Sequence, residues 1–168
     1  ILRTDDGAVW PWLGLLLGLG LFNKIGVLVF GAALAAGLVA TTFVVVYLGP
    51  IVTGSGPHAG DDAASRTGLD VEAVSQLHVD AVFLLLGLIV GTWFAARAAG
   101  SPGRVARSAA VLLAVALGQG TIGFAQYFTG LPIVLVGLHL LGACLLVVAS
   151  VWLLLSTRER VAVAPTTP

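Results

Sequence analysis

Long runs of apolar residues, separated by short polar or glycine- and proline-rich segments, dominate the pattern of the chain. Four runs are long enough to cross a bilayer, whose hydrocarbon core takes about 20 helical residues. They cover residues 26–52, 77–96, 108–128 and 133–156. Backbone polar groups inside a bilayer must be paired within their own segment, so we expect four helices. The Gly49-Pro50 pair should end or kink the first helix near one membrane surface.

The composition of the chain supports the same class of protein. Hydrophobic residues make up 58% of the sequence and charged residues only 10%, whereas a soluble domain carries about 25% charged residues. We therefore predict an all-α integral membrane protein, a four-transmembrane-helix bundle embedded in the lipid membrane. The net charge is zero and no block of lysine and arginine is present, so nucleic acid is not an expected partner.

Both ends of the chain are predicted to lie outside this bundle. Residues 9–22 are apolar but short for a span, and Trp10 and Trp12 are typical of a membrane interface. Residues 1–24 are therefore interpreted as an interfacial segment or the trimmed end of a preceding transmembrane helix. The membrane domain is expected at residues 25–160, and residues 161–168 are expected to form a disordered tail. Because the sequence starts with Ile1 rather than Met, we expect a piece of a longer protein.

The distribution of lysine and arginine predicts how the helices are oriented. If the four helices alternate in direction, one side of the membrane receives nearly all the cations: Lys24, Arg97, Arg104, Arg107, Arg158 and Arg160. Cytoplasmic loops are enriched in these residues, so the topology is predicted to be N-in and C-in, in the plasma membrane. The opposite side carries a long loop at residues 53–76, where Arg66 is outnumbered by four acidic residues.

Two of the three histidines lie in apolar runs. His78 is at the outer start of the second run, and His139 lies about two turns into the fourth. Both helices run from outside to inside, so the two rings are expected at similar depth. A histidine inside a membrane is costly and normally faces a partner or a cavity. Each ring either bonds to a neighbouring helix, or the two rings together bind one ligand.

The residues around the histidines narrow the choice of a shared ligand. Zinc usually needs three or four protein ligands, and Asp80 does not share a helix face with His78, because it is only two residues away. Heme iron needs only two axial ligands, and histidine is a common one. Ala81 follows His78, and Gly142 follows His139, by about one turn. Such small side chains leave room for a flat macrocycle, so the pair is predicted to ligate heme iron.

Other polar residues have two interpretations each. Gln119 and Gln126 share one face of the third helix and either bond across helices or line the heme slot. His58 lies in a Gly/Pro-rich outer loop, as a solvated turn residue or as a group at the mouth of the slot. Arg66 is either a surface charge or the partner of a heme propionate. Cys144, the single cysteine, is expected to be a small buried hydrophobic residue.

Three segments of the chain, taken in order, resemble a known family. They read "VTGSGPHAGD", "LHVDAVFLLLG" and "GQGTIGFAQYFTGLPIVLVGLHLLGA". Together they are similar to the heme A synthase family in its actinobacterial form, over residues 26–156. The resemblance implies the C-terminal four-helix half of a pseudo-symmetric eight-helix protein. It matches His78 and His139 to the pair that holds a heme b in that half.

The resemblance also implies an activity and partners. The family is an oxidoreductase that converts heme O to heme A, by oxidising a ring methyl to a formyl group, for cytochrome oxidase. Its substrate heme and catalytic glutamate belong to the N-terminal half, and no glutamate lies in a predicted span of this chain, so no catalytic residue is assigned. The implied partners are heme O with the missing N-terminal half, and heme O synthase or an electron donor. A stand-alone bis-histidine b-type cytochrome and a heme-free assembly subunit remain the alternatives.

Overall fold

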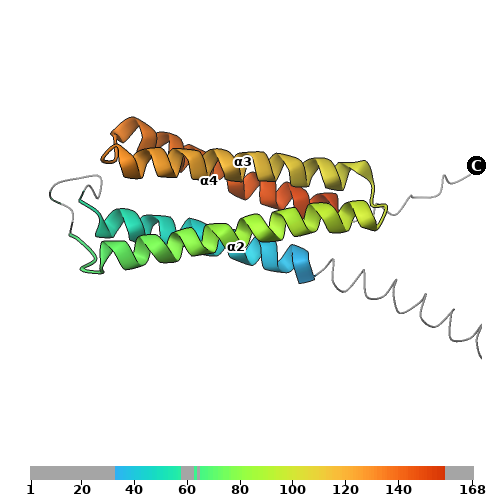
Figure 1. Cartoon of the computed structure of the whole chain (residues 1–168), viewed down its shortest axis with the longest axis horizontal. Helices are drawn as coiled ribbons and strands as arrows, with labels where there is room; N and C mark the ends of the chain where they lie inside the picture. Colours follow the sequence, from blue (N-terminus) through green and yellow to red (C-terminus); the bar gives the residue numbers. More distant parts are fainter. Residues whose placement is uncertain (1–32, 58–62, 64, 158–168) are drawn as a thin grey trace, which may run out of the picture.

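A computed structural model describes residues 33–57, 63 and 65–157 of the chain. Within these residues four helices follow one another: Ala33–Ser55, α2 at Val71–Ala98, α3 at Gly103–Phe128 and α4 at Ile133–Ser156 (Figure 1). Each is long and apolar enough to cross a membrane, and no strand occurs in the described part of the chain. The predicted all-helical bundle of four spans is confirmed. The predicted segments 1–24 and 161–168 lie outside the described residues.

The sequence predicted that Gly49-Pro50 ends or kinks the first helix. The helix does not end there but continues to Ser55. Proline removes one backbone donor from a helix, and side-chain hydroxyls add hydrogen bonds in the turn that follows. The Thr53 hydroxyl donates to the Gly49 carbonyl at 3.1 Å, and the Ser55 hydroxyl donates to the Ile51 carbonyl at 2.8 Å. The glycine–proline pair is therefore accommodated inside the helix.

Helix α2 begins at Val71, six residues before the predicted position. The side chain of Asp70 accepts a hydrogen bond from the backbone N–H of Ala73 at 2.8 Å, so Asp70 caps the helix. Glu72 lies in the first turn, where the helix dipole favours negative charge. The prediction followed hydrophobicity alone and assigned this polar first turn to the loop. The connection between the first two helices is shorter as a result.

The helices pack as an antiparallel bundle in which neighbours in sequence are neighbours in space. Helix α3 contacts both α2 and α4, whereas no Cα atom of α2 lies within 8 Å of one in α4. The Ala33–Ser55 helix contributes Leu38 and Val45 to the same core. Helices α2 and α4 are therefore diagonal to each other, and both begin at the same end of the bundle (Figure 1).

The core of α2, α3 and α4 is confined to the half of the bundle nearest the α2–α3 connection. In the other half, which covers residues 71–84, 117–128 and 133–141, Gln126 is the one buried residue of these helices. The buried apolar residues of the three helices are Leu85, Ile89, Ala96, Val105, Ala109, Leu112, Ala116, Leu146, Ala149 and Leu153. The three helices are thus tightly packed at one end and loosely packed at the other.

Small and hydroxyl-bearing residues hold α3 and α4 together at the packed end. The hydroxyl oxygens of Ser108 and Ser156 lie 2.8 Å apart across the two helices, and Ser108 is fully buried. Nε of Arg104 donates to the backbone carbonyl of Ser156 at 3.0 Å. Small residues allow membrane helices to approach closely, so the start of α3 is fixed against the end of α4.

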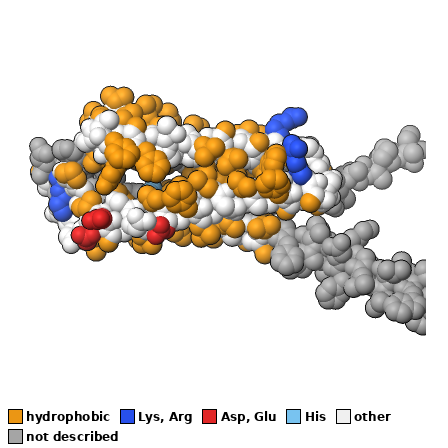
Figure 2. All heavy atoms as spheres, in the orientation of Figure 1, with side chains coloured by type: hydrophobic (Ala, Val, Ile, Leu, Met, Phe, Trp, Pro, Cys, Tyr) orange, Lys and Arg blue, Asp and Glu red, His pale blue; other side chains and the backbone are white. Residues whose placement is uncertain are grey.

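The outer surface of the helices is apolar, as a lipid environment requires. Figure 2 shows hydrophobic side chains over the middle of the molecule and charged ones toward its two ends. Cys144 lies on this surface: its side chain is exposed rather than buried, so the prediction of a buried cysteine is wrong. In a membrane both the lipid-facing and the interior faces of a helix are apolar. Hydrophobic character therefore does not predict burial there.

Replacing Ser108 by leucine tests the contact between α3 and α4. We expect Ser108→Leu to destabilise the chain by about 1–3 kcal/mol, because the larger side chain has no space where the helices meet. Ser108→Ala should cost only about 0.6 kcal/mol, the typical value of one interhelical hydrogen bond in a membrane. Unfolding in mixed detergent micelles measures both. Thr121→Leu is the matched control, since Thr121 is exposed on the same helix, and an equal loss there would contradict the packing described.

Candidate functional site

His78 and His139 lie at the same level of the bundle, in its loosely packed half. Each is about two turns from the start of its helix, α2 or α4, and the two helices begin at the same end. His78 lies deeper than expected from the sequence, because α2 starts earlier than predicted. Both rings therefore lie about two turns from the start of their helices, which is consistent with the expected similar depth.

The two imidazole rings come from diagonal helices, and the Nδ1 atom of each is buried. Each residue is partly buried, and the two rings are close enough for their charges to interact. The ring of His78 is also within hydrogen-bonding reach of the backbone of Val45, in the first helix. The structure thus brings together the two residues that the sequence singled out.

One ring nitrogen of each histidine has no partner. The Nδ1 atoms of His78 and His139 are buried and make no hydrogen bond within the described part of the chain. A buried polar atom left unpaired costs about 1–3 kcal/mol, and there is no water in the hydrocarbon of a bilayer to reduce this cost. The interpretation that each ring bonds to a neighbouring helix is therefore not met at these two atoms. The unpaired atoms favour the interpretation of a shared ligand.

Helix α3 forms a wall beside this pair. A Cβ atom added at Gly123 would lie 3.4 Å from Cε1 of His139, so the ring packs against the backbone of α3. Gln126, one turn further along α3, is buried, with 7% of its surface exposed. Gln119, Gly123 and Gln126 recur at helical spacing on one face. This spacing is the feature of the sequence that could have indicated Gly123. Nothing in the apolar run around Val45 marks that residue as a neighbour of His78.

Gln119 reaches across to α4 and lies over Gly142. A Cβ atom added at Gly142 would overlap the side-chain amide of Gln119. The Gln119 side chain therefore packs against α4, while its hydrogen bond across helices and its place in a heme slot both stay predictions. From the sequence we expected Gly142 to leave room for a macrocycle. The Gln119 amide occupies that space. Ala81, the small residue after His78, remains partly exposed.

The outer-loop residues with predicted roles are only partly described. Arg66 donates from Nη2 to the backbone carbonyl of Pro57 at 2.7 Å, and its neighbour Thr67 contacts the hydroxyl of Ser55. These contacts hold the loop against the end of the first helix. The Arg66 guanidinium thus has a hydrogen-bond partner within the protein, without a ligand. His58 lies outside the described residues.

The chemistry available here is that of two imidazoles. Among the described residues, no three histidine, cysteine, aspartate or glutamate side chains come together. Two imidazoles are the number of protein ligands that a heme iron takes. Comparisons with protein families, with characterised proteins and with solved structures found no match for this chain.

A valine at Gly142 tests the packing between α3 and α4 beside the histidines. We expect Gly142→Val to destabilise the chain by about 1–3 kcal/mol, because the new side chain overlaps the Gln119 amide. Most of this loss of stability should disappear in a Gln119→Ala background, because the stability effects of substitutions at contacting residues are not additive. Gly137→Val, on the same helix with nothing within 4 Å of its Cβ position, is the control. Fully additive effects of Gly142→Val and Gln119→Ala in detergent unfolding would contradict the contact.

Proposed function

We propose that this chain binds one heme b between His78 and His139 and is the C-terminal, heme-binding half of a heme A synthase. The observation that carries the proposal is the arrangement of the two rings. They lie at one level on diagonal helices, each with an unpaired buried nitrogen, in the loosely packed half of the bundle. A flat apolar cofactor with two open axial positions suits such a site.

The residues around the pair fit a heme held by two histidines. Contact with the backbone of Val45 restrains the ring of His78, and contact with Gly123 restrains that of His139. Such outer contacts orient metal-binding imidazoles. When bound, the heme would supply one-electron redox chemistry. With both axial positions taken by protein, the site is suited to electron transfer or to stabilising the fold, rather than to binding oxygen.

The assignment to heme A synthesis rests on the resemblance of the three segments quoted above. In that family the oxidation of the heme O methyl is associated with the N-terminal half and its glutamate. Glu72 is the one glutamate among the described residues, and it is exposed in the first turn of α2. We therefore assign no catalytic residue to this chain. Its partners are the N-terminal half with heme O, and heme O synthase or an electron donor.

The proposed topology is N-in and C-in, in the plasma membrane. Arg97 lies in the last turn of α2, and Arg104 and Arg107 lie in the first two turns of α3, so all three are near the α2–α3 connection. Arginine is enriched on the cytoplasmic side of membrane proteins. This connection then faces the cytoplasm. The histidine pair consequently lies toward the outer leaflet, in the half of the bundle near the other connections.

A stand-alone b-type cytochrome is the second candidate. It is favoured by one observation: the contacts of both histidines come from within these four helices, through Val45 and Gly123. Co-expression of the chain with an N-terminal half from the heme A synthase family, in cells that make heme O, separates the two functions. Heme A formed only when both are present supports the synthase. Heme-loaded chain with no heme A supports the cytochrome.

Replacing either histidine by alanine tests the heme site itself. The chain purified in mild detergent with heme supplied should show sharp low-spin b-type bands after reduction with dithionite. His78→Ala and His139→Ala should each abolish these bands, because six-coordinate iron needs both imidazoles. Leu77→Ala and Leu138→Ala are matched controls, since each side chain neighbours a histidine but is about half exposed on the lipid-facing surface. Low-spin bands that persist in both histidine variants would show that the pair does not ligate iron.

A further inference from the structure

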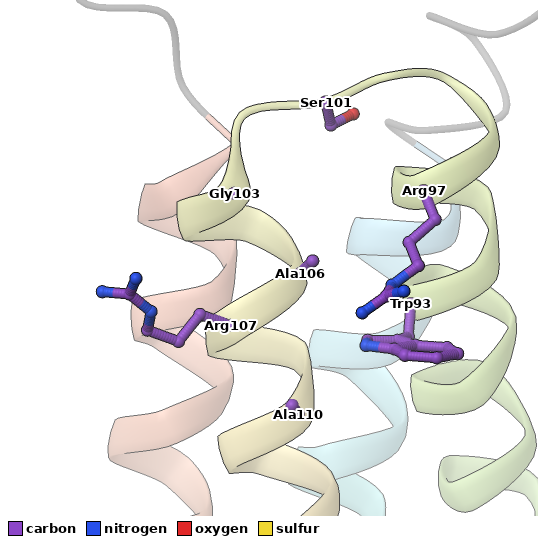
Figure 3. A pocket seen from close by; sticks show the side chains of 7 residues that line it. All are labelled: Trp93, Arg97, Ser101, Gly103, Ala106, Arg107 and Ala110. Carbon is purple, nitrogen blue, oxygen red and sulfur yellow. The ribbon is translucent and has the colours of Figure 1, made fainter.

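A surface groove lies between α2 and α3, at the end of the bundle opposite the loosely packed half. Near the α2–α3 connection it is lined by Trp93 and Arg97 from α2, by Ser101 from the connection, and by Ala106 and Ala110 from α3 (Figure 3). Small residues of α3 form one wall of the hollow, and the large side chains of α2 form the other. None of these residues takes part in the histidine site.

Arg97 gives this part of the groove a positive charge. Its guanidinium lies 4.3 Å from the centre of the Trp93 ring, a cation–π contact that holds it beside the hollow. No carboxylate pairs with Arg97 among the residues that the structure describes. Arg107 also lines the hollow, although Figure 3 shows its guanidinium turned away from Arg97. The guanidinium of Arg97 is therefore the charge that faces the polar end of the groove, and no acidic residue lines it.

The last turn of α2 fixes the position of Ser101 at the polar end. The backbone N–H of Ser101 donates to the carbonyl of Ala96 at 2.9 Å, and that of Gly100 donates to Arg97 at 3.2 Å. This pattern needs a left-handed residue, and Gly100 supplies it with φ of 61°. The Ser101 side chain is thereby held in the lining of the hollow together with Arg97.

The groove continues as an apolar channel toward the middle of the membrane. Trp93 and Ala110 line both parts, so the polar and apolar parts are continuous. Phe94 is 60% exposed and Leu117 53% exposed, which places the channel on the lipid-facing surface. The other residues that line it are Val90, Leu113 and Ala114.

We propose that this groove binds one anionic glycerophospholipid, with its phosphate at Arg97 and Ser101 and an acyl chain along the apolar channel. The charge of the groove matches that of the headgroup, and arginine is well suited to phosphate. Trp93 lies where the two parts meet, and tryptophan is enriched at this depth of a bilayer. Anionic lipids are abundant in the cytoplasmic leaflet, to which the proposed topology assigns this end. The site is independent of heme binding.

Quenching of Trp93 fluorescence by brominated lipids tests the proposal. The full chain, with Trp10, Trp12 and Trp152 replaced by phenylalanine, is placed in phosphatidylcholine bilayers that contain a minor fraction of lipid brominated near its headgroup. Brominated phosphatidylglycerol should quench Trp93 well beyond its share of the lipid, whereas brominated phosphatidylcholine should quench in proportion to its share. Arg97→Gln should lower the preference about fivefold, the effect of one cation near an anionic surface. Ala110→Leu should remove it by filling the groove.

A chain that retains Trp152 as its single tryptophan is the matched control. Trp152 lies near the end of α4, at the same end of the bundle, and is 44% exposed. It should be quenched equally by both brominated lipids. Equal quenching of Trp93 by the two lipids, or a preference unchanged in Arg97→Gln, overturns the proposal. So does loss of the preference on adding soluble glycerophosphate, which would indicate a phosphate site rather than a lipid site. Protection of Trp93 from both lipids would instead indicate a second protein chain in the groove.

Discussion

The close approach of α3 to α4 at Ser108 and Ser156 is the contact on which the shape of the bundle depends. It brings two helices together through small side chains and a buried hydrogen bond of 2.8 Å. Packing of this kind is a main source of stability between membrane helices, because lipid leaves little hydrophobic force between them. At the other end, α2, α3 and α4 bury no apolar side chain. His78 and His139 lie in that half, on α2 and α4.

The two ends of the bundle therefore differ in their chemistry as well as in their packing. One end holds two imidazoles with unpaired Nδ1 atoms, in a half where α2, α3 and α4 bury no apolar side chain. The other is well packed and carries arginines on its surface, beside the groove at Trp93. We propose that the first binds heme and that the second binds a lipid. The packed end would then keep the heme site in place within the membrane.

Much of this arrangement could be predicted from the sequence, and the reasons are physical. The length of an apolar run determines whether a helix can span a bilayer, and this located α4 and the end of α3, whereas α3 begins at Gly103, five residues before the predicted position. The cost of an intramembrane histidine made His78 and His139 stand out. The start of α2 was missed because its first turn is polar and depends on the cap at Asp70. Cys144 and Val45 could not be placed, because in lipid an apolar residue is equally acceptable inside and outside the bundle. The Gln119 amide over Gly142 depends on how two helices meet, which one sequence does not specify.

The central claim is that one iron is held by both histidines. Electron paramagnetic resonance of the oxidised chain, purified in mild detergent with heme supplied, measures this most directly. The account predicts a low-spin ferric signal that corresponds to one heme for each chain. A high-spin ferric signal, from iron with an open axial position, or a chain that retains no heme would contradict it.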